Sequence, residues 1–303
     1  MRKKIGRDRL SGGWLRPVVQ LANIVAVAFA LHGCVRQQGI ERVEWSVMGT
    51  VAAVQAKGME AGVAPSSVED AMRRISTEAR GTFTGVETLL NAHNYGSELC
   101  RIAALPDVDA VKSCTGAVRP CYEAAFALWK ATDGAFNPRW RGVKTLDLGA
   151  IAKGFAVDLA AERMEAPRGV AALIDLGGNV KAMKGEWRTG VKDPGGNGFV
   201  ASVVLKEGEA LATSATYFRG AHIHDGRTGK PVSNGVASVT VLCDSAMWAD
   251  GLSTALFVLG PDEGRAFLDR HLAELVGERK VEVLWILSGG GKVTYPASTR
   301  FAE

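Results

Sequence analysis

TLDLGAIAKGFAVD, residues 145–158, predicts a tight turn at Gly149 that leads into a helix with one buried face. Ile151, Phe155 and Leu159 recur every four residues, which is the spacing of an apolar helical stripe. The free N–H groups at the start of this helix, together with Lys153 in its first turn, suit a phosphate or pyrophosphate. The same residues also fit a glycine cap followed by an ordinary amphipathic helix with a solvated lysine.

A second apolar helix is predicted over residues 246–259. Asp250 and Thr254 lie one turn apart on one of its faces. One carboxylate and one hydroxyl form a sparse set of hard oxygens, which fits Mg²⁺ when water, a backbone carbonyl and substrate phosphate complete the shell. In the alternative interpretation, Asp250 bonds to an amide of a neighbouring loop and Thr254 bonds back to its own helix.

Residues 222–231 read HIHDGRTGKP and form a turn-rich segment, preceded by Ala212-Thr213-Ser214. Histidine is the commonest general base, so His222 is a candidate for proton transfer. A β-turn with a surface histidine is the alternative.

The other segments predict an α+β fold with mixed or antiparallel sheets packed with helices, because strands and helices mix without regular alternation. Helix-start signals lie at Pro65, Ser66 and Ser67, followed by Asp70. A further helix is predicted over residues 118–132, and the buried helix extends over 148–164. Strands are predicted at residues 43–55, 171–174, 187–191, 201–205 and 238–242, with a terminal hairpin at 281–287 and 292–295.

Composition narrows the functional classes. The chain has 303 residues and is 47% hydrophobic, which excludes intrinsic disorder. Its formal charge of +4 comes from the first 33 residues, and the remainder carries 30 basic and 31 acidic side chains. Nucleic-acid binding is therefore not expected. The sequence contains no GxGxxG, GxSxG or HExxH pattern, so common dehydrogenase and hydrolase sites lose support.

The first residues have the layout of an export signal: a cationic stretch ends at Arg16 and fourteen mostly apolar residues follow, Val18 to Leu31. Leu31-His32-Gly33-Cys34 resembles a bacterial lipobox. We therefore expect a signal peptide over residues 1–33, a tether over 34–42 that is lipidated at Cys34, and one catalytic domain over 43–303. This predicts an exported protein, lipid-anchored at the periplasmic face of a bacterial membrane. An ordinary signal peptide with an incidental cysteine is the alternative.

Four cysteines remain beyond Cys34. They lack the spacing and the neighbouring histidines of a zinc site. A disulfide among Cys100, Cys114 and Cys121 and buried free thiols are both compatible with the sequence.

Taken in order, these segments resemble the bacterial flavin transferase family ApbE, whose members are exported and often lipid-anchored FAD:protein FMN transferases. The resemblance runs from about Trp45 to Phe301. It rests on Met48-Gly-Thr50, Ser97-Glu-Leu99, Gly134-Ala-Phe-Asn-Pro138, Asp147 to Gly154 with Asp158, Gly177-Gly178, Thr213-Ser214, His222 with Asp225 and Arg227-Thr-Gly229, and Ala249-Asp250 to Leu259-Gly260.

The resemblance implies a flavin transferase fold and a transferase reaction. FAD is split at its pyrophosphate, FMN passes to a Thr or Ser hydroxyl of a client protein, and AMP leaves. Clients would be exported or membrane flavoproteins, including subunits of membrane electron-transfer complexes. Catalytic Asp250 would hold Mg²⁺ with Thr254 and the Ala150 carbonyl, and catalytic His222 would accept a proton or contact FAD. The residues that would contact FAD are Met48, Ala135, Phe136, Asn137, Asp147 and Lys153.

The chain departs from the family pattern in three places. Ten positions separate Asn137 from Asp147, where the family has a longer segment; His93 stands where Tyr is common; and Ala215-Thr216 replaces Gly-Asp. Two other functions therefore remain open beside FMN transfer to protein. One is a Mg²⁺-dependent FAD pyrophosphatase, in which water replaces the client hydroxyl, and the other is a lipoprotein that binds flavin without turnover.

Overall fold

The computed structural model describes residues 39–60, 63–216, 222–297 and 299–302. The predicted signal peptide and Cys34 lie outside these ranges. The helices are α1 (Pro65–Leu90), α2 (Glu98–Ile102), α3 (Asp107–Ser113), α4 (Arg119–Ala131), α5 (Ala152–Glu162) and α6 (Ala246–Val276). The strands are β1 (Ile40–Val47), β2 (Thr50–Gly58), β3 (Val170–Leu176), β4 (Asn179–Lys184), β5 (Trp187–Lys192), β6 (Phe199–Leu205), β7 (Ala210–Ala215), β8 (His224–Asp225), β9 (Lys230–Pro231), β10 (Val236–Cys243), β11 (Glu282–Leu287) and β12 (Lys292–Tyr295).

Eight of the described strands form one sheet in the order β1-β2-β3-β4-β7-β10-β11-β12. Every pair of neighbours is antiparallel. Strand β3 is buried along its whole length, which fits its largely apolar sequence, broken only by Asp175, and its position between β2 and β4. The predicted α+β class with an antiparallel sheet is confirmed.

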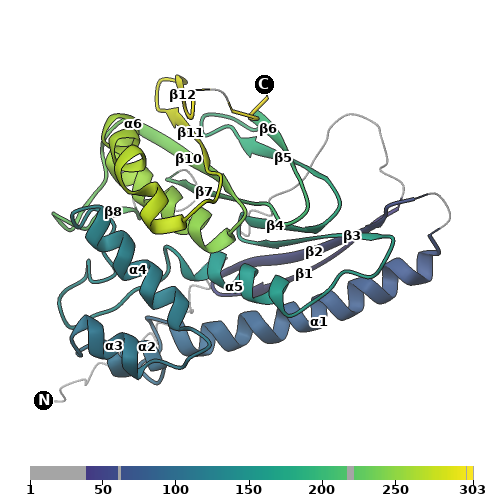
Figure 1. Ribbon diagram of the computed structural model, residues 1–303, viewed down its shortest axis with the longest axis horizontal. Helices are drawn as coiled ribbons and strands as arrows, with labels where there is room; N and C mark the ends of the chain where they lie inside the picture. The colour runs from purple at the N-terminus through teal and green to yellow at the C-terminus, as the bar shows by residue number, and fades with distance from the viewer. Residues whose placement is uncertain (1–38, 61–62, 217–221, 298, 303) are drawn as a thin grey trace, which may run out of the picture.

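The two faces of the sheet are covered differently (Figure 1). The main core lies between the sheet and α1, α4, α5 and α6, and it contains Phe83, Leu128, Ile151 and Trp285. On the other face, the hairpin β5–β6 packs Trp187 and other apolar side chains against the sheet. Helix α1 runs along β1, β2 and β3 (Figure 1). Helices α5 and α6 therefore share one side of the sheet, and the candidate site lies where they meet.

Some predicted boundaries shift. The strand predicted over residues 43–55 is a hairpin of β1 and β2, which turns at Met48 (φ 51°) and Gly49 (φ 66°). Strand β1 begins at Ile40, ahead of the domain start expected at residue 43. The predicted helix start at Pro65 is confirmed: α1 begins there after Ala64, and it has no side-chain cap, because a proline suits the first helical position.

Helix α6 consists of two parts joined at Gly260, whose φ of 73° is not helical, and Pro261 starts the second part. The Asn234 side chain donates to the carbonyls of Phe257 and Val258, at 2.8 and 3.1 Å, and so satisfies groups at the end of the first part. The predicted helix over residues 246–259 is this first part.

The cysteines Cys100, Cys114, Cys121 and Cys243 are free thiols. Burial raises the pKa of Cys121 and of Cys243, so both stay protonated at neutral pH. Within the described ranges, no helix combines the length and the apolar character needed to cross a bilayer.

Candidate functional site

Helices α5 and α6 approach each other so closely at Gly154 that no side chain fits there. A Cβ on Gly154 would lie 2.1 Å from the carbonyl oxygen of Ala246 and 2.7 Å from Cβ of Asp250. The glycine in the Lys153-Gly154 pair is thus explained by close packing of two backbones.

The two helices run antiparallel here, and each supplies a carboxylate to the amino end of the other. Asp158 of α5 accepts hydrogen bonds from the backbone N–H groups of Ala246 (3.0 Å) and Met247 (2.9 Å) and from the Ser245 hydroxyl (2.7 Å). Asp250 of α6 accepts from the backbone N–H of Gly154 at 2.9 Å. Both carboxylates satisfy N–H groups that the helices cannot satisfy themselves, and both face a positive helix end.

Asp250 is 5% exposed, and Lys153 is its cationic partner. The Lys153 ammonium lies 3.4 Å from Asp250 Oδ2 and donates to the Gly149 carbonyl at 3.0 Å. Burial raises the pKa of Asp250, opposed by Lys153 and by the Gly154 N–H. Asp147 accepts from the Gly149 N–H at 2.9 Å, so the turn at Gly149 connects it to the same cluster.

The residues around Asp250 fit a hard divalent cation. Ala150 lies just ahead of α5, and its carbonyl oxygen accepts no hydrogen bond from the described residues, because the Gly154 N–H four residues later bonds to Asp250. Thr254 follows Asp250 by one helical turn. Asn179 is 3% exposed, and its side chain helps to lower the pKa of Asp250. Its Oδ1 atom has no hydrogen-bond partner among the described residues.

These groups are oxygen donors, the type that Mg²⁺ prefers. No group of three His, Cys, Asp or Glu side chains suited to a metal occurs in the described part of the chain. A metal bound at Asp250 would therefore depend on neutral oxygens and on ligands from outside the protein, such as phosphate.

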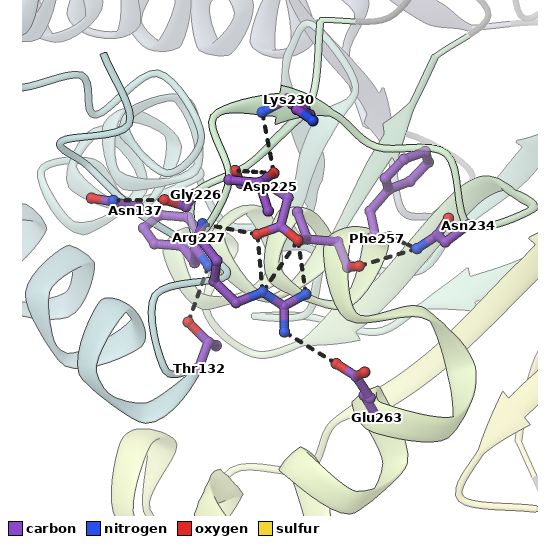
Figure 2. A network of polar contacts seen from close by, with 12 residues as sticks. Thr132, Asn137, Asp225, Gly226, Arg227, Lys230, Asn234, Phe257 and Glu263 are labelled. Atoms are coloured by element: carbon purple, nitrogen blue, oxygen red, sulfur yellow. Dashed lines mark hydrogen bonds and ion pairs between the residues drawn. The ribbon is translucent and has the colours of Figure 1, made fainter. Parts of the chain in front are cut away.

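A second polar network joins residues 134–137 to the turn-rich segment (Figure 2). Asn137 donates to the Gly226 carbonyl at 3.1 Å, and the Gly226 N–H donates to the Ala135 carbonyl at 3.0 Å. Arg227 bonds to both oxygens of Asp225, at 2.8 to 3.2 Å, and reaches Glu263 of α6 at 3.3 Å. Burial alone would raise the pKa of Asp225, but its bonds from Arg227 outweigh this and lower it.

The remaining predicted site residues lie around these two clusters. The Met48 N–H donates to Glu87 of α1 at 3.1 Å. Ala135 and Phe136 are buried in the core, and the Ala135 carbonyl and the Phe136 N–H are bonded to Gly226 and Thr132, so both residues support the segment. His222 is exposed directly ahead of β8.

The short segment between Asn137 and Asp147 is fixed by Arg139, which sequence reasoning missed. Arg139 is 8% exposed; its guanidinium donates to the carbonyls of Ala103 (2.6 Å) and Leu105 (2.8 Å) and pairs with Asp107 at 2.7 Å. The next residue, Trp140, stacks on His224 with ring centroids 4.3 Å apart. A single arginine carries no sequence signal for this role, because Ala103, Leu105 and Asp107 lie over 30 residues before it.

The fold is shared with solved flavin transferases. The structure matches the flavin transferase ApbE from Vibrio cholerae with a TM-score of 0.65 at 22% identity, covering 87% of this chain and 98% of that one. An ApbE protein from Thermotoga maritima matches with a TM-score of 0.65 at 23% identity, covering 84% of this chain and 96% of that one.

The model of the ApbE family matches residues 141–276, which contain α5, the turn-rich segment and α6. The predicted resemblance to this family is confirmed over these residues. The FAD:protein FMN transferase of Haemophilus influenzae is 37% identical over 142 residues, and that of Rhodobacter capsulatus is 40% identical over 130 residues. These alignments cover 42% and 39% of this chain but 41% and 25% of the relatives, so the chain spans less than half of each.

Proposed function

We propose that the chain is a magnesium-dependent FAD:protein FMN transferase. The observation that carries the proposal is the junction of α5 and α6, where a helix amino end, Lys153 and the buried Asp250 meet beside oxygen donors. It has the parts that transfer of a phosphate-linked group needs, namely cationic groups for phosphate and a carboxylate for a metal. The relatives' names and the shared fold support the assignment.

In the proposed reaction, FAD binds with its pyrophosphate at the amino end of α5. Lys153 holds phosphate oxygens at this positive helix end, while Asp147 and Asn137 orient the remainder of the nucleotide. Asp250, Thr254 and the Ala150 carbonyl would hold Mg²⁺, which when bound offsets negative charge on the pyrophosphate. The client hydroxyl oxygen attacks the FMN phosphorus, the bond from that phosphorus to the bridging oxygen breaks, and AMP leaves with the bridging oxygen.

His222 is the proposed acceptor of the proton that the client hydroxyl loses. Its exposure ahead of β8 leaves it open to a protein substrate. The network of Asp225, Arg227 and Glu263 supports this assignment, because it fixes the segment that follows His222 onto α6 (Figure 2).

The experiment incubates the full chain with FAD, Mg²⁺ and a client domain that carries an acceptor threonine, with the client's Thr→Val variant and added chelator as controls. The proposal predicts AMP release that depends on Mg²⁺ and on the threonine. Free FMN and AMP formed equally with both clients would identify a pyrophosphatase instead. FAD that stays intact under every condition would show that the chain binds flavin without turnover.

We also propose that the protein is exported and held at the periplasmic face of a bacterial membrane by a lipid on Cys34, which lies outside the described residues. The cationic stretch, the apolar run and the lipobox-like sequence support this localisation. A single acyl chain binds membranes only marginally, so a multiply acylated amino-terminal cysteine is the form expected to anchor stably. Cys34→Ala should move the protein from the membrane to the soluble fraction, and unchanged membrane retention would contradict the anchor.

A further inference from the structure

Three hydroxyl groups from β7 and α6 form a continuous chain beside Asp250. The Ser253 hydroxyl lies 2.9 Å from the backbone carbonyl oxygen of Asp250. It also lies 2.8 Å from the hydroxyl of Ser214, which in turn lies 3.0 Å from the hydroxyl of Thr254. All three distances are those of good O–H···O hydrogen bonds.

The direction of each bond in this chain is determined, because each hydroxyl has one proton and a carbonyl can only accept. Ser253 must donate to the Asp250 carbonyl, so it can only accept from Ser214. Ser214 has then used its proton and can only accept from Thr254. Thr254 is left as a donor to Ser214, with both of its oxygen lone pairs available on the other side.

We propose that Ser253 and Ser214 are positioning residues that hold the Thr254 hydroxyl proton away from the cation site, so that its oxygen is presented as a metal ligand. This inference rests on the proposed function, since it concerns the same Mg²⁺ site. Two neighbours in a hydrogen-bond network commonly orient a ligand in this way, and they tune its affinity for the metal.

Burial makes the arrangement hard to replace. Ser253 is completely buried, so water cannot substitute for either of its partners. Ser214 and Thr254 are half-buried, at the end of the chain that faces the candidate site. The fixed direction therefore begins inside the protein, at the Asp250 carbonyl, and ends at the Thr254 oxygen.

Replacing Ser253 by alanine should remove the fixed direction of the hydrogen bonds between Ser214 and Thr254. Ser214 would then be free to donate its proton to the Thr254 oxygen. Thr254 would turn its own proton to the Asp250 carbonyl four residues earlier, which is the usual partner of a helical threonine. One of the two lone pairs would be occupied, and the affinity for Mg²⁺ should fall by about tenfold.

The test is calorimetric titration of magnesium chloride into the full chain saturated with FAD, in the absence of a client protein. The variants are Ser253→Ala, Ser214→Ala, the double variant and Ser214→Thr, which keeps a hydroxyl. Thr240→Val is the matched control, because Thr240 and Thr213 form a hydroxyl pair of the same 2.8 Å length between β10 and β7. Thermal unfolding of each variant measures folding separately.

We expect both alanine variants to weaken Mg²⁺ binding by about tenfold, with the double variant no weaker than either single one because all act through Thr254. Ser214→Thr and Thr240→Val should bind like the wild type. Wild-type affinity in Ser253→Ala and Ser214→Ala would overturn the positioning role while leaving the proposed metal site intact. A wild type that does not bind Mg²⁺ would overturn both the metal site and this inference.

Discussion

At the scale of single residues, Asp250 has two roles, capping a helix and binding a metal, and a substitution can separate them. It caps α5 through the Gly154 N–H, which needs only an acceptor oxygen, and it would bind a metal, which needs negative charge. An asparagine retains the first capability and loses the second.

Asp250→Asn should therefore lose at least about 100-fold in Mg²⁺-dependent turnover of FAD, as removal of a ligand to a catalytic metal does. Its free energy of unfolding should stay within about 1 kcal/mol of the wild type, because the substitution also removes the cost of burying a charge. AMP release and urea unfolding measure the two quantities, with Asp262→Asn on the exposed side of α6 as control. Full turnover by Asp250→Asn would refute the metal role.

Whether a site residue could be predicted from sequence depends on how far along the chain its partners lie. Lys153, Asp250 and Thr254 could be predicted, because two helices were recognisable and their polar residues could be placed along one face. Ser214 could not be assigned a role, because its partners Ser253 and Thr254 lie about 40 residues further along the chain. The interpretation in which Thr254 bonds only to its own helix did not include this distant serine, whose hydroxyl lies 3.0 Å from that of Thr254.

At the scale of elements, the contact of α5 with α6 depends on the missing side chain of Gly154. Gly154→Ala should force the helices apart, since a Cβ would overlap the Ala246 carbonyl, and cost several kcal/mol, about 3 or more. Gly81→Ala in the exposed part of α1 meets no atom within 4 Å and should instead stabilise by about 1 kcal/mol. Urea unfolding of both variants is the measurement. Equal stability of the two would contradict the close-packed junction.

Asp158 is the corresponding carboxylate at the amino end of α6, where it also pairs with Lys181 at 2.8 Å. Asp158→Ala leaves a half-buried ammonium and two N–H groups without this acceptor, so we expect a loss of about 3 kcal/mol. Asp158→Asn should lose less, because it still accepts from the helix end. Thermal unfolding compares the two, and an unchanged melting temperature for Asp158→Ala would exclude the capping role.

Elements with a strong period were predictable, and elements defined by long-range pairing were not. The helix over residues 246–259 and the terminal hairpin follow from apolar spacing and turn residues. Strand β4 was missed: it has two lysines among its six residues, and only its pairing with β3 and β7 makes it a strand. The order of the sheet, in which β4 and β10 both pair with β7, has no local signal at all.

At the scale of the whole molecule, stability should depend on Asp175, a carboxyl buried in β3. Burial raises its pKa to about 6 from the ordinary 3.8, against the Gly178 N–H bonded to it at 2.8 Å. Because the folded state binds the proton more tightly than the unfolded one, the contribution of Asp175 to stability is largest below pH 3.8 and falls as pH rises to about 6.

Asp175→Asn keeps the acceptor for Gly178 and cannot ionise. It should be more stable than the wild type at pH 7, by up to about 3 kcal/mol, and the difference should shrink toward pH 4. Urea unfolding at pH 4, 5, 6 and 7 tests this. A stability difference that does not change over that range would show that Asp175 is not the group that titrates.

The proposed function of the whole molecule is transfer of FMN to a protein hydroxyl at the junction of α5 and α6. The most direct measurement is the intact mass of a threonine-bearing client after incubation with the full chain, FAD and Mg²⁺. We expect the client to gain one FMN through a phosphoester, with one AMP released for each, and Asp250→Asn to leave the client unmodified. A client of unchanged mass, with FAD recovered intact, would contradict FMN transfer at this junction.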